Sequence, residues 1–240
     1  MLILGLNKTT LLDYPGYVAA TVFTGGCNFR CPFCHNKVLV LEPSKGGIIS
    51  EKEFFAFLKK RKNILKGVCI TGGEPTLQAD LPDFLARIRE MGYRIKLDTN
   101  GYKPEILKRL IEKGLLDYVA MDIKNSPEKY AVASGMDNMG HDLDLGKIRE
   151  SVDLLMEGRV EYEFRTTVVR ELHTLEDIVK IGEWIRGCRV YFLQKFQDQG
   201  NNICEGYHTP DEGTLREMYH ILSQMTRMEG RVYLRGMDLL

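Results

Sequence analysis

The chain has 240 residues, 44% of them hydrophobic and 28% charged, a balance typical of a globular protein with a substantial core. Its 33 basic residues equal its 33 acidic ones, so no bulk charge draws it to nucleic acid or to an anionic membrane. No run approaches the roughly 20 apolar residues of a membrane span. The opening "MLILGLNKTTLLDYPG" lacks a basic leader, so a cytoplasmic location is expected.

Apolar, β-branched runs alternate with amphipathic helical patterns along the chain. The expected strands are 17–23, 67–71, 94–99, 118–123, 162–169 and 189–196, with a short final strand at 231–236. The expected helices follow a Ser50–Glu53 capping box and then lie near 81–91, 106–111, 175–185 and 214–228. Six strand-then-helix units predict an α/β fold with a parallel sheet, either a partial barrel or an open doubly wound sheet.

No linker or change in composition marks a second domain, so residues 1–240 are expected to form one domain. The longest stretches without a periodic pattern are 24–49, about 124–143 and 197–213. Loops of this length in a compact domain are usually functional or mobile. Within this domain, two segments are distinguished: a loop at 24–36, called the cluster loop because it carries three of the cysteines, and a C-terminal extension of strand and helix at about 197–240.

Distinctive polar residues fall where the expected strands end. "TGGEP" (71–75) closes the second strand, "DTNG" (98–101) the third and "DIK" (122–124) the fourth, while three cysteines follow the first. In parallel α/β folds, ligands bind at the carboxyl ends of the strands. These groups are therefore expected to converge on one mouth.

The stretch "CNFRCPFCHN" (27–36) has cysteines at C-x3-C-x2-C spacing. Structural zinc with His35 as fourth ligand is disfavoured, because Cys34 and His35 are adjacent whereas zinc ligands usually come as separated pairs. "CPFCH" also matches a haem attachment pattern, which leaves Cys27 unexplained. An iron–sulfur cluster fits better, and three ligands on a four-iron cluster leave one iron open to an exogenous group.

This spacing, with Phe33 before the last cysteine, resembles the signature of radical S-adenosylmethionine (SAM) enzymes. The order of "DYPG" (13–16), the cysteine loop, "GGEP" (72–75), "DTNG" and "DIK" resembles the glycyl-radical-enzyme activases. The opening is most similar to the longer form of the activating proteins of anaerobic ribonucleoside-triphosphate reductase. The resemblance is strongest over 9–125, and it implies a partial (β/α)6 TIM-like barrel.

The resemblance implies roles for residues at matching positions. The ligands of a [4Fe–4S] cluster would be Cys27, Cys31 and Cys34. The segment whose backbone holds the methionine amino group of SAM would be Gly72, Gly73 and Glu74. Glycines suit this second role because a bare backbone approaches a ligand closely.

Four further residues are implied as SAM contacts. Asp98 would contact the methionine end, and Lys124 would lie near its carboxylate or the ribose. Asn36 and Gln197 would lie beside the nucleoside, although the family often has histidine at the latter position. Asp98, Thr99 and Asp122 also resemble the monovalent-cation site of some activases.

The resemblance further implies that one electron from the cluster cleaves SAM and that the resulting radical takes a glycine α-hydrogen from a partner enzyme. Because the cofactors carry the chemistry, no side chain is assigned as catalytic acid, base or nucleophile. The expected partner is anaerobic ribonucleotide reductase. Since no further cysteine cluster is present, flavodoxin or ferredoxin is expected to donate the electron.

Three alternatives stay open at this point. One is an activase of pyruvate formate-lyase or another glycyl radical enzyme, and a second is a radical SAM enzyme acting on a small molecule. The third, from a different class, is a non-catalytic metal-binding or regulatory protein.

Overall fold

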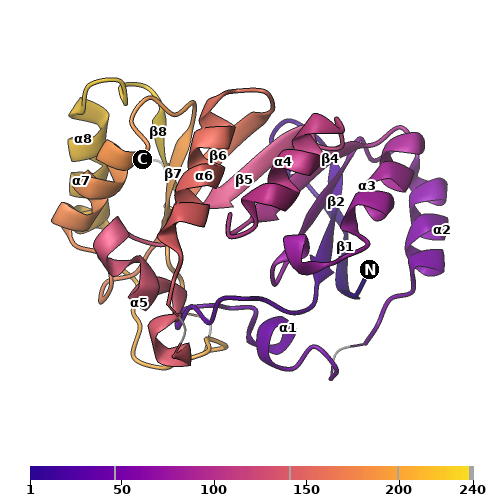
Figure 1. Cartoon of the computed structure of the whole chain (residues 1–240), viewed down its shortest axis with the longest axis horizontal. Coiled ribbons are helices and arrows are strands. Elements are labelled where there is room, and N and C mark those ends of the chain that lie inside the picture. The colour runs from indigo at the N-terminus through magenta and orange to yellow at the C-terminus, as the bar shows by residue number, and fades with distance from the viewer. Residues whose placement is uncertain (46, 141, 199, 238–240) are drawn as a thin grey trace. The chain divides into compact units, whose positions relative to one another are not determined.

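The computed structural model describes residues 1–45, 47–140, 142–198 and 200–237 (Figure 1). Its contacts divide the chain into two compact units. The first comprises 1–28, 36–120 and 158–161, and the second comprises 29–35, 121–157 and 162–240. The extension expected at 197–240 includes residues 199 and 238–240, which lie outside the described ranges. Within those ranges no helix is long and apolar enough to cross a bilayer.

The first unit holds four strands in sequence order, β1 (Ile3–Thr10), β2 (Ala19–Thr24), β3 (Gly67–Gly72) and β4 (Arg94–Thr99). β2, β3 and β4 are parallel, with Val22 beside Ile70 and Ile70 beside Leu97, all fully buried. The helices of this unit are α1 (Lys37–Leu41), α2 (Glu51–Arg61), the 3-10 turn η1 (Pro75–Leu77), α3 (Leu81–Glu90) and α4 (Pro104–Glu112).

Local sequence signals set the helix positions in this unit. The predicted capping box begins α2, because the Ser50 hydroxyl accepts from the Glu53 amide at 3.2 Å and the Glu53 carboxylate accepts from the Ser50 amide at 2.9 Å. Phe54 of α2 stacks on Phe84 of α3 with ring centroids 5.2 Å apart, and both rings are buried. This aromatic contact joins the two helices.

The second unit holds β6 (Glu161–Val168, whose first residue falls in the first unit), β7 (Tyr191–Lys195) and β8 (Val232–Arg235), which are parallel neighbours in that order. The division between the units falls within β5 (Tyr118–Asp122). The helices of this unit are η2 (Pro127–Lys129), α5 (Tyr130–Ser134), η3 (Asp137–Met139), α6 (Leu145–Met156), α7 (Leu175–Trp184) and α8 (Glu212–Gln224). Helix α8 contacts α7, β7 and β8 (Figure 1).

Three predictions need correction. Residues 3–10 form an antiparallel strand, β1, that was not expected, because the alternation of apolar and polar residues in this segment is weak. The stretch 124–143 is not irregular but contains η2, α5 and η3. Helix α6 was missed although its buried Ile148, Val152 and Leu155 have helical spacing.

Asp177 fixes the start of α7 to the segment that leads into α5. Its buried carboxylate accepts from the Thr174 amide at 2.9 Å, the Thr174 hydroxyl at 2.8 Å, Lys129 Nζ at 2.7 Å and the Ser126 hydroxyl at 3.2 Å. Burial raises the pKa of Asp177, but the hydrogen bonds from Lys129 and Thr174 outweigh it and leave the pKa lowered.

We predict that Asp177→Ala lowers the free energy of unfolding at pH 7 by about 2–4 kcal/mol, because buried donors lose their acceptor. Urea denaturation measures this change. The control is Glu176→Ala, an exposed residue in the same turn, whose free energy of unfolding should change by less than about 0.5 kcal/mol. Because the folded pKa of Asp177 is lowered, its stabilisation is present above the unfolded pKa and is lost as the pH falls through the folded one. The difference between wild type and variant should therefore shrink below about pH 4. Equal effects of the two substitutions would contradict this role.

Candidate cofactor site

The turn after β3 packs closely on the start of the cluster loop within the first unit. The Gly73 amide donates to Thr24 O at 2.9 Å, and the Glu74 amide donates to Gly26 O at 2.8 Å. A Cβ on Gly73 would lie 1.9 Å from Gly26 O, and Gly72 has φ +120°. The two glycines are required here by backbone approach and by backbone conformation.

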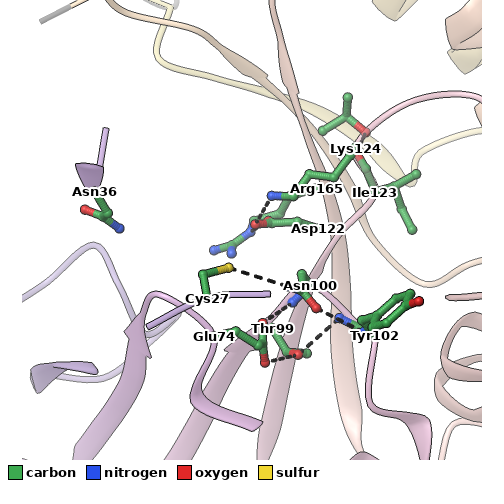
Figure 2. Close-up of polar contacts among 12 residues, drawn as sticks. Cys27, Asn36, Glu74, Thr99, Asn100, Tyr102, Asp122, Ile123, Lys124 and Arg165 are labelled. Carbon is green, nitrogen blue, oxygen red and sulfur yellow. Dashed lines mark hydrogen bonds and ion pairs between the residues drawn. The ribbon is translucent and has the colours of Figure 1, made fainter. Parts of the chain in front are cut away.

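The Glu74 carboxylate is buried and fully engaged inside the first unit (Figure 2). Oε1 accepts from the Thr76 hydroxyl at 2.6 Å, the Thr76 amide at 3.1 Å and the Thr99 hydroxyl at 2.7 Å, and Oε2 accepts from the Asn100 amide at 2.7 Å. Burial raises the pKa of Glu74 more than these hydrogen bonds lower it. The side chain therefore ties "GGEP" to "DTNG", and only its backbone is available to a ligand.

Two amide side chains connect the other predicted residues of the first unit. Asn36 Nδ2 donates to Gly72 O at 2.9 Å, which places Asn36 against the glycine turn. Asn100 Nδ2 donates to Asn28 Oδ1 at 2.8 Å and lies 3.9 Å from Cys27 Sγ. Asn100 was not among the predicted site residues, although its place in the strand-end group "DTNG" was a signal.

Asp98 is paired with a residue that the sequence analysis also missed. The Lys96 ammonium, on the same face of β4 and only 2% exposed, donates to Asp98 Oδ1. The Cys69 thiol lies 3.6 Å from the same oxygen. A lysine two residues before an aspartate within a predicted strand was the available signal, because side chains at i and i+2 share a face.

The second unit holds the other half of the cysteine loop in place. The Arg30 amide donates to Ser134 O at the end of α5 at 2.9 Å, and the Cys204 amide donates to Pro32 O at 2.9 Å. A Cβ on Gly135 would lie 2.1 Å from Arg30 O. Segments that the sequence analysis described only as long loops thus support the turn between Cys31 and Cys34.

Asp122, Lys124 and Arg165 form an ion-pair cluster in the second unit (Figure 2). Lys124 Nζ lies 3.0 Å from Asp122 Oδ2 and Arg165 Nε lies 2.9 Å from Asp122 Oδ1. Burial opposes ionisation of Asp122, but the two cations hold its pKa at about 2. Burial alone would lower the pKa of Lys124, but the negative charge of Asp122 has the larger effect, so the pKa of Lys124 is raised. Lys124 is therefore a permanent cation.

A cavity of about 360 Å³ in the second unit collects four of the predicted residues. Its wall includes Cys31, Cys34, Lys124 and Gln197. The His35 ring also lines it and stacks on Phe196 with centroids 5.3 Å apart. Residues with thiol, ammonium and amide groups thus line one space large enough for part of a ligand.

The predicted cluster ligands are divided between the units, with Cys27 in the first and the other two in the second. In neither unit do the described residues include three or more His, Cys, Asp or Glu side chains grouped to hold a metal ion, so the three-cysteine ligand set stays a prediction. The donor chemistry fits iron–sulfur, because no disulfide joins the six cysteines. Burial raises the pKa of the Cys31 thiol to about 11, and the Lys124 ammonium opposes this and favours the thiolate.

Comparison with known proteins decides the family. The sequence model of the radical SAM superfamily matches residues 21–185. The chain is also 34% identical, over 220 residues and 90% of each chain, to a Methanocaldococcus jannaschii protein named as a glycyl-radical enzyme activating enzyme. This chain belongs to the radical SAM superfamily, in the family of glycyl-radical enzyme activating enzymes. Members of the superfamily use a [4Fe–4S] cluster and SAM.

Solved structures support the fold of this radical SAM protein. A radical SAM methyltransferase from Sphaerobacter thermophilus matches 95% of this chain and 68% of its own, with a TM-score of 0.71 at 15% identity. A domain of pyruvate-formate lyase-activating enzyme from Bacteroides vulgatus matches 71% of this chain and 99% of its own, with a TM-score of 0.54 at 20% identity. The predicted α/β class, the partial (β/α)6 barrel of this superfamily, is confirmed.

We predict that Glu74→Ala lowers the free energy of unfolding by about 2–4 kcal/mol, because the buried Thr76 and Asn100 amides lose their acceptor. Urea denaturation of the two proteins side by side measures the difference. Glu112→Ala, an exposed glutamate of the same unit, is the matched control and should change stability by less than about 0.5 kcal/mol. A Glu74 variant as stable as the control would show that the two turns are held by other contacts.

Proposed function

We propose that this chain activates a glycyl radical enzyme by reductively cleaving SAM and removing an α-hydrogen from a glycine of that partner, and that the partner is anaerobic ribonucleoside-triphosphate reductase. Its family membership supports the reaction class. The observation that carries the assignment to this chain's own residues is the cavity that brings Cys31, Cys34, Lys124 and Gln197 together. The partner is proposed from the resemblance of the N-terminal segment.

The proposed cluster ligands are Cys27, Cys31 and Cys34. When bound, the cluster and SAM supply the one-electron chemistry that removes a hydrogen atom. The protein's own residues hold and orient the cluster and SAM. The hydrogen bond from the Cys204 amide to Pro32 O holds the turn between Cys31 and Cys34. The Asn100 side chain contacts Cys27 Sγ.

The proposed SAM contacts follow the polarity of its amino acid end. The backbone of Gly72, Gly73 and Glu74 would accept from the amino group, with Asp98 beside it. Lys124 suits the carboxylate, because its charge is permanent and its ammonium reaches the cavity wall. Asn36 and Gln197 would hold the nucleoside through side-chain amides, which donate and accept.

Electron supply is proposed to come from flavodoxin or ferredoxin. Outside the cluster loop Cys69 and Cys188 are buried and Cys204 stands apart in sequence, so the chain offers no second cysteine cluster to carry electrons. We also propose a cytoplasmic, anaerobic setting, where thiols and a low-potential cluster stay reduced.

The competing partner is pyruvate formate-lyase or another glycyl radical enzyme, and a small-molecule substrate is the third candidate. A non-catalytic metal-binding role is disfavoured by membership of an enzyme family and by the cavity beside two of the cysteines.

We predict that the anaerobically reconstituted, reduced protein gives a four-iron EPR signal whose shape changes with SAM. Mixed with SAM and anaerobic ribonucleotide reductase, it should produce a glycyl radical signal in that partner, and pyruvate formate-lyase mixed in the same way should stay radical-free. Cys31→Ser should abolish both effects, because a cluster ligand is lost. Cys204→Ser, which leaves the backbone bond to Pro32 in place, is the matched control and should retain both.

Each failure has its own meaning. A radical only in pyruvate formate-lyase would replace the partner and keep the reaction class. A cluster signal that ignores SAM, or tightly held zinc without iron, would overturn the activase assignment and favour a metal-binding protein.

A further inference from the structure

The three residues expected to bind a monovalent cation are all engaged by other protein groups. In the first unit, Asp98 is paired with the Lys96 ammonium. The Thr99 hydroxyl donates to Glu74 Oε1 at 2.7 Å and accepts from the Gly101 amide at 3.1 Å. In the second unit, Asp122 is paired with two cationic side chains. The expected ligand set therefore does not fit a bound K⁺ or Na⁺, which needs oxygen ligands that protein cations have not already neutralised.

We propose that the Lys96 ammonium takes the place of that cation, as a built-in positive charge on Asp98. This proposal rests on the proposed function, in which Asp98 lies at the methionine end of SAM. It makes Lys96 a positioning residue, which acts through Asp98. It also makes SAM binding by this chain independent of K⁺ and Na⁺.

The Lys96–Asp98 ion pair is buried within the first unit. Lys96 is 2% exposed and stands between Ile95 and Leu97, both fully buried, in β4. A buried ammonium is costly unless it is paired and hydrogen-bonded. Asp98 supplies the opposite charge, and the Cys69 sulfur lies 3.9 Å from Lys96 Nζ as a second, weaker partner.

The ammonium has the charge of K⁺ and reaches the same carboxylate, yet it cannot dissociate. It supplies a positive charge beside Asp98 and fixes one carboxylate oxygen, whatever the salt. A cation from solution would instead have to bind each time, and the affinity for SAM would then depend on its concentration through linkage. The two arrangements therefore differ in a measurable way.

The first experiment uses the wild-type, anaerobically reconstituted protein. SAM affinity is measured by titration calorimetry in tetramethylammonium chloride, KCl and NaCl at equal ionic strength. We expect the three dissociation constants to agree within about twofold, whereas a coupled cation would change them by roughly fivefold or more. A gain of that size with K⁺ or Na⁺ would overturn the proposal.

The second experiment needs neither SAM nor a partner. The melting temperature of wild type should be the same in the three salts, and that of Lys96→Met should fall by roughly 6 °C or more in tetramethylammonium. K⁺ or Na⁺ should raise it again, because Asp98 regains a cation. Lys180→Met, which removes an exposed lysine, controls for the loss of one positive charge.

The double variant Lys96→Met/Asp98→Asn removes both charges and should melt without any response to K⁺ or Na⁺. It also covers the case in which Lys96→Met does not fold, because removing both partners of a buried pair is far less costly than removing one. If a folded Lys96→Met variant has the same melting temperature in all three salts, the proposal that Lys96 takes the place of a bound cation is refuted.

The outcomes separate this proposal from the proposed function. A protein that binds no SAM in any salt would remove the activase assignment, while the melting experiment would still decide whether Lys96 replaces a cation. Conversely, cation-dependent SAM binding would refute the role of Lys96 and leave glycyl radical formation untouched.

Discussion

The buried carboxylate of Glu74 is the interaction on which the first unit's strand-end turns depend. Four hydrogen bonds join it to Thr76, Thr99 and Asn100, so the turns after β3 and β4 are held by a single side chain. The Glu74 amide in turn holds Gly26 at the start of the cysteine loop. Because an unsatisfied buried acceptor is costly, the loss of any of these partners weakens the connection between the turns.

The second unit uses charge where the first uses hydrogen bonds to a buried acid. Asp122 is paired with Lys124 and Arg165, and Arg165 also lies 4.0 Å from the buried carboxylate of Glu163. Lys124 also lines the cavity with Cys31 and Cys34. The Lys124 ammonium suits an anionic group of a ligand, and it also favours thiolate over thiol.

Much of this architecture could be predicted from sequence because its signals are local. Caps such as Ser50 with Glu53, and strand ends such as "DTNG", are recognised within a few residues. The support of Pro32 by Cys204 joins segments distant in the chain, so no local pattern contains it. The pairing of β1 with β2 joins neighbouring strands, but the weak alternation of β1 concealed it. Helix α6 is different, because its helical spacing was present and was overlooked.

Lys96 was only partly predictable from the sequence. Its place on the face of Asp98 follows from strand periodicity, but its burial depends on how neighbouring strands and helices cover β4. Buried ion pairs seldom add stability over apolar side chains of similar size, so stability alone is a weak reason for a lysine inside this strand. A ligand that needs an ionised, oriented Asp98 gives a stronger one. The cost of burying the pair is then borne by the fold so that the carboxylate is already in place when the ligand arrives.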